Sequence, residues 1–588
     1  GELKKAKIDD LSFNEFAGKL PSSFVNMTSL RTLTLANNHL IGNIGPYLSN
    51  FNSLQSLNFE GNQFENPIPF HFQTFFFINI SSNFPLLNNL NMSGNAIHGS
   101  IPYELSLISS LYALDLSDNQ LSGQIPYNIS GYEKKLRFLS FSNNKLHGPI
   151  PLMLSMFSSL HSLFLDGNSL SGCIPSNFFN SSSEIQNLDL SDNSFIGKIP
   201  SQIKNSIELF ELAMSNNHFE GSIPSELTNL EGLKYLDISQ NKLVGCVPSF
   251  VNSFARTIHL SDNNLSCLSK NMFEESSDLV TLDLSNNAIV SGFHDLMHDL
   301  QYTGLNILLL KGNHFKGNIP NALCHLTSLT ILDLSYNNFV GEIPSCFGKM
   351  PFENKDPETS RTQFNEIPLH QSSKKRSETY TTSVLIYMSG IDLSHNELNG
   401  SIPSELGNLT RIRALNLSNN FFTGKIPATF SNLVQVESLD LSFNMLSGRI
   451  PTQLSELTFL EVFSVAHKNL SGATPERKGQ FITFDESSYE ARVLKGNQFL
   501  CGLPLPKSCN PSGQTPPSLP NGLDEENDSW VDMYVFRVSF VVAYISILLI
   551  IAAVLYINPY WRRAWFYYIG SVGMNCYYFM EDNFFKLF

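Results

Sequence analysis

The phrase LDLSDNQLSGQIP at Leu114–Pro126 recurs with small variations along most of the chain. Most copies follow the one before at a step of 24 residues, and one Asn marks the register of each copy. A fixed period of this length predicts a solenoid in which each coil buries its apolar face against its neighbours. Lys468 occupies the Asn position in a degenerate last copy, and the Asn is kept in the others: Asn14, Asn38, Asn62, Asn95, Asn119, Asn144, Asn168, Asn193, Asn217, Asn241, Asn263, Asn287, Asn313, Asn337, Asn396, Asn420 and Asn444.

One coil explains why these residue types recur. Leu114 and Leu116 alternate with Asp115, which is the pattern of a strand with one buried face. The amide of Asn119 can donate to and accept from backbone groups, so stacked copies would form a ladder that satisfies buried polar groups. Gly123 permits a turn with positive φ. We therefore interpret the repeated Leu, Asn and Gly residues as structural and exclude them from the functional site.

The repeat is interrupted once by a long insertion. We expect about 14 coils over residues 1–345, an insertion over 346–387 that we call the island, and four coils over 388–475. The island carries a basic run of Lys374, Lys375 and Arg376. Charge runs are usually solvated loops, but long loops on rigid scaffolds often carry binding residues, so both interpretations stay open.

The C-terminal part of the chain reads as a membrane anchor. A cap over 476–510 and an acidic linker over 511–537 precede residues 538–557, which contain no charge, Pro or Gly. Twenty such residues are long enough to cross a bilayer. Acidic residues before this segment and Arg562 and Arg563 after it predict extracellular repeats and a cytoplasmic tail over 558–588. The expected location is the plasma membrane, with single-pass type I topology.

Seven of the eight cysteines precede that segment. Cys246 and Cys267 follow the Asn of adjacent coils at nearly the same offset, which places them within disulfide reach. Cys324 and Cys346 also lie in successive coils and form a second candidate pair. Cys173 is then either a buried small hydrophobe or a free thiol.

Charge and sequons bound the possible partners. The net charge of −15 and the pI near 5.4 argue against nucleic acid. Asn91 and Asn416 lie at outward mid-strand positions, where a glycan would block the surface; we expect ligand contact elsewhere, or these two sites unmodified. The density of N-x-S/T sequons favours a glycoprotein that follows the secretory route to the membrane, and they occur at Asn26, Asn79, Asn91, Asn128, Asn180, Asn264, Asn399, Asn408, Asn416, Asn469 and Asn527.

Outward positions of the predicted strands are the candidate ligand-binding surface. Most of them carry small or acidic residues, and we interpret these Asp residues mainly as bridges between adjacent coils. Exposed aromatic and aliphatic groups on a rigid sheet are candidate anchors for a peptide. The exceptions to the common pattern are therefore our candidates: Phe138, Phe164, Asp166, Glu211, Tyr235, His259, Ile307, Leu309 and Lys311.

The repeated L-x-G-x-I-P segment resembles the plant-specific class of leucine-rich repeats over roughly residues 6–475. This resemblance implies an α/β-type solenoid, a curved array with a parallel concave β-sheet and a short second sheet beside it, here with one transmembrane helix. The order of coils, island, four coils, cap, span and WRRAWFYY tail resembles the plant leucine-rich-repeat receptor-like proteins, which lack a kinase. A disulfide between Cys501 and Cys509 in the cap is implied by the same resemblance.

The family resemblance implies a cell-surface receptor for an extracellular peptide, protein or cell-wall-derived ligand, in defence or development. It implies two protein partners, an adaptor receptor-like kinase and a co-receptor kinase, with the co-receptor contacting the coils from Asn396 to Lys468. We expect no enzyme, cofactor or metal, because no HExxH, G-x-S-x-G, phosphate-loop or kinase motif occurs. Two alternatives stay open. One is an inhibitor of a pathogen wall-degrading enzyme; the other is a truncated or decoy receptor, because the chain opens without a signal peptide or a paired-Cys cap.

Overall fold

The structure is a computed structural model. It describes residues 7–509 except 28, 44–52, 66–67, 69–84, 128–134, 180–183, 252, 274–277, 351, 353–388, 467–469, 491–496 and 498. Residues 1–510 form one unit and residues 511–588 a second. The predicted linker, span and tail lie outside the described residues, as do Lys374, Lys375 and Arg376 of the island and the sequons Asn79, Asn128, Asn180, Asn469 and Asn527. Among the described residues, no helix has the length and apolar character that a membrane crossing needs.

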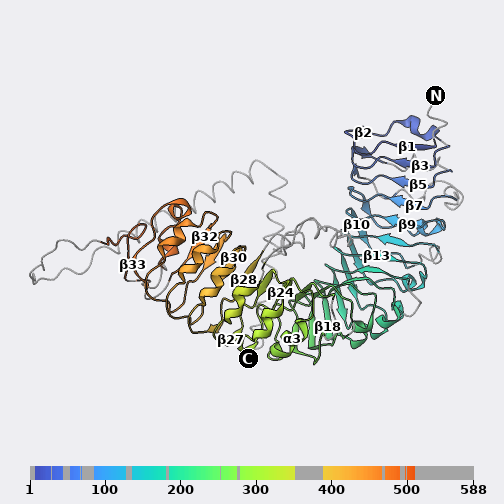
Figure 1. Ribbon diagram of the computed structural model, residues 1–588. Coiled ribbons are helices and arrows are strands. Elements are labelled where there is room, and N and C mark those ends of the chain that lie inside the picture. Colours follow the sequence, from blue (N-terminus) through green and yellow to red (C-terminus); the bar gives the residue numbers. More distant parts are fainter. Residues whose placement is uncertain are drawn as a thin grey trace, which may run out of the picture. The chain divides into compact units, whose positions relative to one another are not determined.

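One parallel sheet of 18 strands runs through the first unit, with one three-residue strand for each coil (Figure 1). This confirms the predicted solenoid with a parallel sheet. In pairing order the strands are β1 (Ile8–Asp10), β3 (Thr32–Thr34), β5 (Ser56–Asn58), β7 (Asn89–Asn91), β9 (Ala113–Asp115), β11 (Phe138–Ser140), β13 (Ser162–Phe164), β15 (Asn187–Asp189), β17 (Glu211–Ala213), β19 (Tyr235–Asp237), β21 (Thr257–His259), β23 (Thr281–Asp283), β24 (Ile307–Leu309), β26 (Ile331–Asp333), β28 (Gly390–Asp392), β30 (Ala414–Asn416), β31 (Ser438–Asp440) and β32 (Val462–Ser464).

Shorter parallel sheets form from the L-x-G-x-I-P segments, as the resemblance implied. The first contains β2 (Ala17–Lys19), β4 (His39–Gly42) and β6 (Gln63–Phe64). The second contains β8 (His98–Gly99), β10 (Gln120–Gly123), β12 (Lys145–Gly148), β14 (Ser169–Gly172), β16 (Ser194–Gly197), β18 (His218–Ser222), β20 (Lys242–Val247) and β22 (Asn264–Leu268). The third contains β25 (Lys316–Asn318), β27 (Asn338–Gly341) and β29 (Glu397–Leu398), and a fourth pairs β33 (Ser471–Ala473) with β34 (Phe499–Cys501).

Short 3-10 helices complete most coils, and eleven of them begin directly after a Pro. These eleven are η2 (Ser22–Asn26), η3 (Tyr103–Leu107), η5 (Leu152–Met156), η6 (Ser176–Phe179), η7 (Ser201–Asn205), η8 (Ser225–Asn229), η9 (Asn321–His325), η10 (Ser345–Lys349), η11 (Ser404–Asn408), η12 (Ala428–Asn432) and η13 (Thr452–Glu456). The others are η14 (Gly479–Ile482) and η15 (Glu486–Ser488). One coil departs from this pattern: the α-helix α3 (Phe293–Leu300) stands where other coils carry a 3-10 helix, and residues 288–292 before it form no strand of the second sheet.

The Asn residues form the ladder that the sequence predicts. The Asn144 side-chain amide donates to the carbonyls of Leu116 and Phe141, at 3.0 and 3.1 Å, and accepts from the N–H of Leu121 at 2.9 Å. Each such Asn thus joins its own coil to the coil before it. It also pairs buried backbone N–H and C=O groups, which would cost free energy if they stayed unpaired. A position that the sequence reasoning missed is Asn497, which plays the same part in the cap by accepting from the N–H of Leu470 at 3.1 Å.

The island leaves the solenoid without breaking the long sheet. β26 pairs directly with β28, although the insertion separates them in the sequence. The N–H of Phe339 donates to Asn396 at 3.0 Å, which continues the Asn ladder across the junction. The coils on the two sides of the island are therefore ordinary neighbours.

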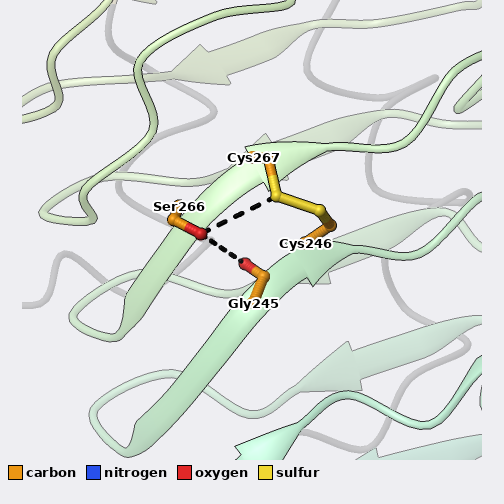
Figure 2. Close-up of a disulfide and its surroundings, with 4 residues drawn as sticks. All are labelled: Gly245, Cys246, Ser266 and Cys267. Atoms are coloured by element: carbon orange, nitrogen blue, oxygen red, sulfur yellow. Dashed lines mark hydrogen bonds between the residues drawn. A yellow bond between two sulfur atoms is a disulfide. The ribbon is translucent and has the colours of Figure 1, made fainter.

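Three disulfides tie neighbouring coils and the cap, and they are the three pairs anticipated from the sequence. Cys246 of β20 is bonded to Cys267 of β22 (Figure 2), and the Ser266 hydroxyl beside it donates to the carbonyl of Gly245 at 3.4 Å. The others join Cys324 to Cys346 and Cys501 to Cys509. Cys173 is unpaired and exposed, so the structure favours the free thiol over the buried hydrophobe.

Candidate functional site

The outward face of the long sheet consists of the first and third residues of each strand, because the middle residue points into the core. Leu139, Leu163, Leu188, Leu212 and Leu236 are the buried middle residues of five consecutive strands. In a parallel sheet the outward residues of neighbouring strands lie about 4.8 Å apart in rows. Any ligand on this face therefore meets two regular rows of side chains, and the residues just after each strand add a third.

The structure corrects the expected exposure of several candidates. We expected all of them to be open, but Phe164, Glu211 and Ile307 are only 6–8% exposed and Asp166 is 3% exposed. Phe164, for example, packs against the Phe138 ring of the adjacent strand. Phe138, Tyr235, His259 and Leu309 are half-buried, and Lys311 is exposed. A ligand could therefore contact the tops of these groups but could not surround them.

Two aromatic pairs lie on this face. The Phe138 and Phe164 rings of β11 and β13 have centroids 5.6 Å apart at an angle of 53°. The Tyr235 and His259 rings of β19 and β21 have centroids 6.0 Å apart at an angle of 75°. β15 and β17 separate the two pairs in the sheet, so the face has two aromatic walls with a gap of two strands between them.

The gap between the walls is acidic. Asp189 on β15 accepts from the N–H of Ser191 at 2.9 Å, and Asp166 accepts from the hydroxyl of Ser142. Burial, followed by the charge of Asp166, raises the pKa of Asp189 well above its usual range. Burial alone raises the pKa of Glu211 to about 7.

A second group of candidates lies two strands farther along. Ile307 and Leu309 are the outward residues of β24, and the ammonium of Lys311 lies 5.6 Å from the centre of the Tyr336 ring. Tyr336 in turn stacks on His395. The sequence reasoning missed Tyr336 and His395; the signal was available, since an aromatic or His residue stands there directly before a ladder Asn, where Asn, Asp or Gly is usual.

Two sequons lie on the same face. The amide nitrogen of Asn91 donates to Glu60 at 3.3 Å, and that of Asn416 donates to Asp392 at 3.1 Å. Both nitrogens are thus engaged by a carboxylate of the preceding coil. Asn26, Asn264, Asn399 and Asn408 are exposed. Across the described part of the chain, no three His, Cys, Asp or Glu side chains are grouped to hold a metal ion.

Comparison with known proteins identifies the repeats. The Leucine Rich Repeat family model matches residues 53–75, 110–132, 135–157, 159–181, 184–206, 208–230, 328–350, 389–409, 411–433 and 435–457. Cuscuta receptor 1 of Solanum lycopersicum is 62% identical over 218 residues, which are 37% of this chain and 19% of that relative. Receptor-like protein 13 of Arabidopsis thaliana is 46% identical over 297 residues, which are 45% of this chain and 27% of that relative. The chain thus carries leucine-rich repeats and is similar to plant receptor-like proteins.

Solved leucine-rich-repeat ectodomains share the fold. The Arabidopsis receptor kinase HAESA, solved in complex with the peptide hormone IDA and the co-receptor SERK1, is 27% identical with a TM-score of 0.61. The match covers 81% of this chain and 76% of the HAESA chain. The chain matches only about a fifth to a quarter of the two curated receptor-like relatives, 19% and 27% of their lengths.

Proposed function

We propose that this chain is the ligand-binding part of a plant cell-surface receptor-like protein that binds an extracellular ligand on the outward face between β11 and β24. The observation that carries this proposal is the departure from the small and acidic pattern on that stretch, where two aromatic pairs flank buried carboxylates. Aromatic anchors on a rigid scaffold are typical of binding surfaces. We assign the chain a binding role and no catalytic residue.

Among peptide, protein and cell-wall-derived ligands, we favour a peptide. The candidate groups lie in straight rows across the strands, and an extended peptide fits such rows at about 3.3 Å per residue. The likeness to HAESA, whose structure holds a peptide hormone, supports the same choice. The identity of the ligand decides whether the receptor acts in defence or in development.

The test is capture of ligands by the full chain. The protein is immobilised, apoplastic fluid is passed over it, and retained peptides are identified by mass spectrometry. We expect the double variant Phe164→Ala and Tyr235→Ala to retain at least tenfold less peptide than the wild type does. Tyr103→Ala with Tyr127→Ala, which removes two exposed rings elsewhere, is the matched control. Equal retention by wild type and both variants would place the site off this face.

We further propose that residues 538–557 anchor the chain in the plasma membrane with the repeats outside. The uncharged segment and the two arginines that follow it support this topology. Protease treatment of intact cells tests it: the repeats should be digested, while an epitope placed after Phe588 stays protected. Protection of the repeats would contradict the proposed orientation.

Signalling is proposed to run through partner receptor kinases that contact the last four coils. Phe421, Phe443 and Met445 lie in two adjacent coils there, and each is 45–49% exposed. Exposed apolar side chains that cluster in this way mark contact surfaces. Replacing Phe421 and Met445 by Asn should lower recovery of a receptor kinase from plasma membrane at least fivefold. Unchanged recovery, measured beside Tyr103→Asn, would remove this patch from the partner surface.

A further inference from the structure

The gap between the two aromatic walls contains a carboxylate whose charge nothing in the described chain balances. Glu211 is 8% exposed, and no side-chain hydrogen bond or ion pair holds its carboxylate in the described part of the chain. Its oxygens still reach the surface, because Glu104 Oε2 is the one fully buried, unpaired side-chain oxygen among the described residues. Its backbone neighbour Leu212 points into the core, so the Glu211 side chain points toward the outward face. An ionised carboxylate in a mostly covered position without a partner costs free energy, and the cation of a ligand would offset that cost.

Two aspartates flank Glu211 on the adjacent strands, and a third lies beyond one of them. Asp189 is the diagonal neighbour on β15, and its charge and that of Glu211 influence each other. Asp237 lies on β19 beside Tyr235, and Asp166 follows β13. No cation among the described residues acts on Asp189 or Glu211. Two basic side chains that directly precede strands of this sheet are engaged elsewhere: Lys234 pairs with Asp278 at 3.4 Å, and the Arg137 guanidinium lies over the Tyr112 ring at 5.5 Å. The cluster therefore offers negative charge without an internal cation.

The chemistry of this cluster selects its ligand. An organic cation fits this cluster, because carboxylates pair with ammonium and guanidinium groups through strong charge-assisted hydrogen bonds. A lysine ammonium or an arginine guanidinium would pair with Glu211 and gain the attraction that aromatic faces offer to cations. The rings of Phe164 and Tyr235 lie on opposite sides of Glu211, so they would contact the apolar part of the same ligand.

We propose that Glu211, with Asp189 and Asp237 on the adjacent strands, is a subsite for a basic side chain, lysine or arginine, of a peptide ligand. This inference rests on the proposed peptide recognition and specifies its chemistry. Phe164 lies two strands from Glu211, roughly 10 Å away across the sheet, which is about three extended residues. The ligand should therefore carry an apolar residue about three positions from the basic one.

The test selects a display library of random twelve-residue peptides on the full-length protein, on Glu211→Gln and on Glu220→Gln. Glu220 is an exposed glutamate of β18 outside the long sheet, so its variant has the same charge change at a different surface. Glutamine keeps the size of glutamate, and thermal unfolding verifies that all three proteins are folded. The strongest binders are then synthesised with their basic residue or with uncharged norleucine in its place.

We expect binders from the wild type and from Glu220→Gln to carry Lys or Arg, and norleucine to weaken binding at least tenfold. On Glu211→Gln the same replacement should change binding less than twofold. Binders without a basic residue, or an equal norleucine effect on Glu211→Gln, would overturn this subsite and leave peptide recognition standing. Retention of no peptide by any protein would overturn both. A glucosamine oligomer also carries ammonium groups and serves as a competitor. If it displaces the bound peptides at a lower concentration than free peptide does, the natural ligand of this subsite is not a peptide.

Discussion

The rings of Tyr336 and His395 stack with centroids 4.0 Å apart and planes 11° from parallel, across the point where the island leaves the solenoid. Both residues have a φ of 52°, a region that side-chain-bearing residues seldom adopt. The stack lies beside the ladder bond from Phe339 to Asn396. The fourteenth and fifteenth coils are thus joined by an aromatic contact as well as by the backbone.

This contact predicts a measurable coupling between the two coils. Tyr336→Asn and His395→Asn keep a residue that tolerates positive φ, as Asn286 and Asn419 do at the same position of other coils. The double-mutant cycle should give a coupling of about 0.5–1.5 kcal/mol, as for other aromatic pairs. Hydrogen exchange at the Tyr336 amide, which donates to Ser394 at 3.0 Å, reports the local opening. Strictly additive single effects would contradict the stack.

Glu211 should make stability depend on pH. Its pKa is about 7 in the folded protein against 4.5 for the free group, so the folded state binds the proton more tightly. Its contribution is therefore fully present below about pH 4.5 and is lost as the pH rises through about 7. Glu211→Gln should stabilise the protein at pH 8, by on the order of 3 kcal/mol at most, and leave it nearly unchanged at pH 4.5.

Thermal unfolding of wild type, Glu211→Gln and Glu220→Gln at both pH values checks this prediction. Glu220→Gln should show no difference between the two pH values relative to wild type, because Glu220 is exposed. A Glu211→Gln variant that gains as much stability at pH 4.5 as at pH 8 would exclude the ionised carboxylate as the cause.

Removing one ladder Asn should weaken the fold locally. Asn217 accepts from the N–H of Phe195 at 2.9 Å and donates to the carbonyl of Leu190 at 2.9 Å, and both groups are buried. Asn217→Ala leaves these groups unpaired, which should cost roughly 2–4 kcal/mol. Denaturant unfolding measures the loss, and Asn205→Ala at the exposed end of η7 is the control. Equal midpoints for the two variants would show that the ladder is dispensable.

The Cys246–Cys267 disulfide should stabilise the middle of the solenoid. It closes a loop of 21 residues, for which the chain-entropy estimate is about 3 kcal/mol. The Cys246→Ser, Cys267→Ser double variant should unfold at lower denaturant than Cys173→Ser, which removes an exposed unpaired thiol. If both variants unfold like the wild type, the bond contributes nothing to equilibrium stability.

Glycosylation should avoid the outward face. The amide nitrogens of Asn91 and Asn416 are engaged by Glu60 and Asp392, whereas Asn264, Asn399 and Asn408 are exposed. In glycopeptide mass spectrometry of the protein from plant membranes, we expect glycans at the exposed sites and bare Asn91 and Asn416. Full occupancy at Asn416 would exclude ligand contact near β30.

Much of the architecture was readable from the sequence because each coil contacts only its neighbours. The spacing of Asn119 and Asn144 was sufficient to predict stacked strands, and the matched offsets of Cys246 and Cys267 were sufficient to predict their pairing. Candidate binding residues could be chosen as well, since Phe164 and Tyr235 depart from a repeated pattern. Local period and residue type settle such features, so they need no knowledge of distant contacts.

The tertiary structure alone decided what the neighbouring coils do to each side chain. Glu211 and Phe164 were expected to be exposed but are 8% and 6% exposed, since strands about 4.8 Å apart bring neighbouring side chains together, as Phe138 and Phe164 show. Asn497 joins the ladder although no full repeat surrounds it. Tyr336 meets His395 only because β26 pairs with β28 across the island. The burial of a side chain depends on contacts between coils, and so does the pKa of a buried carboxylate. The repeat pattern, in contrast, can be recognised from the residues of a single coil.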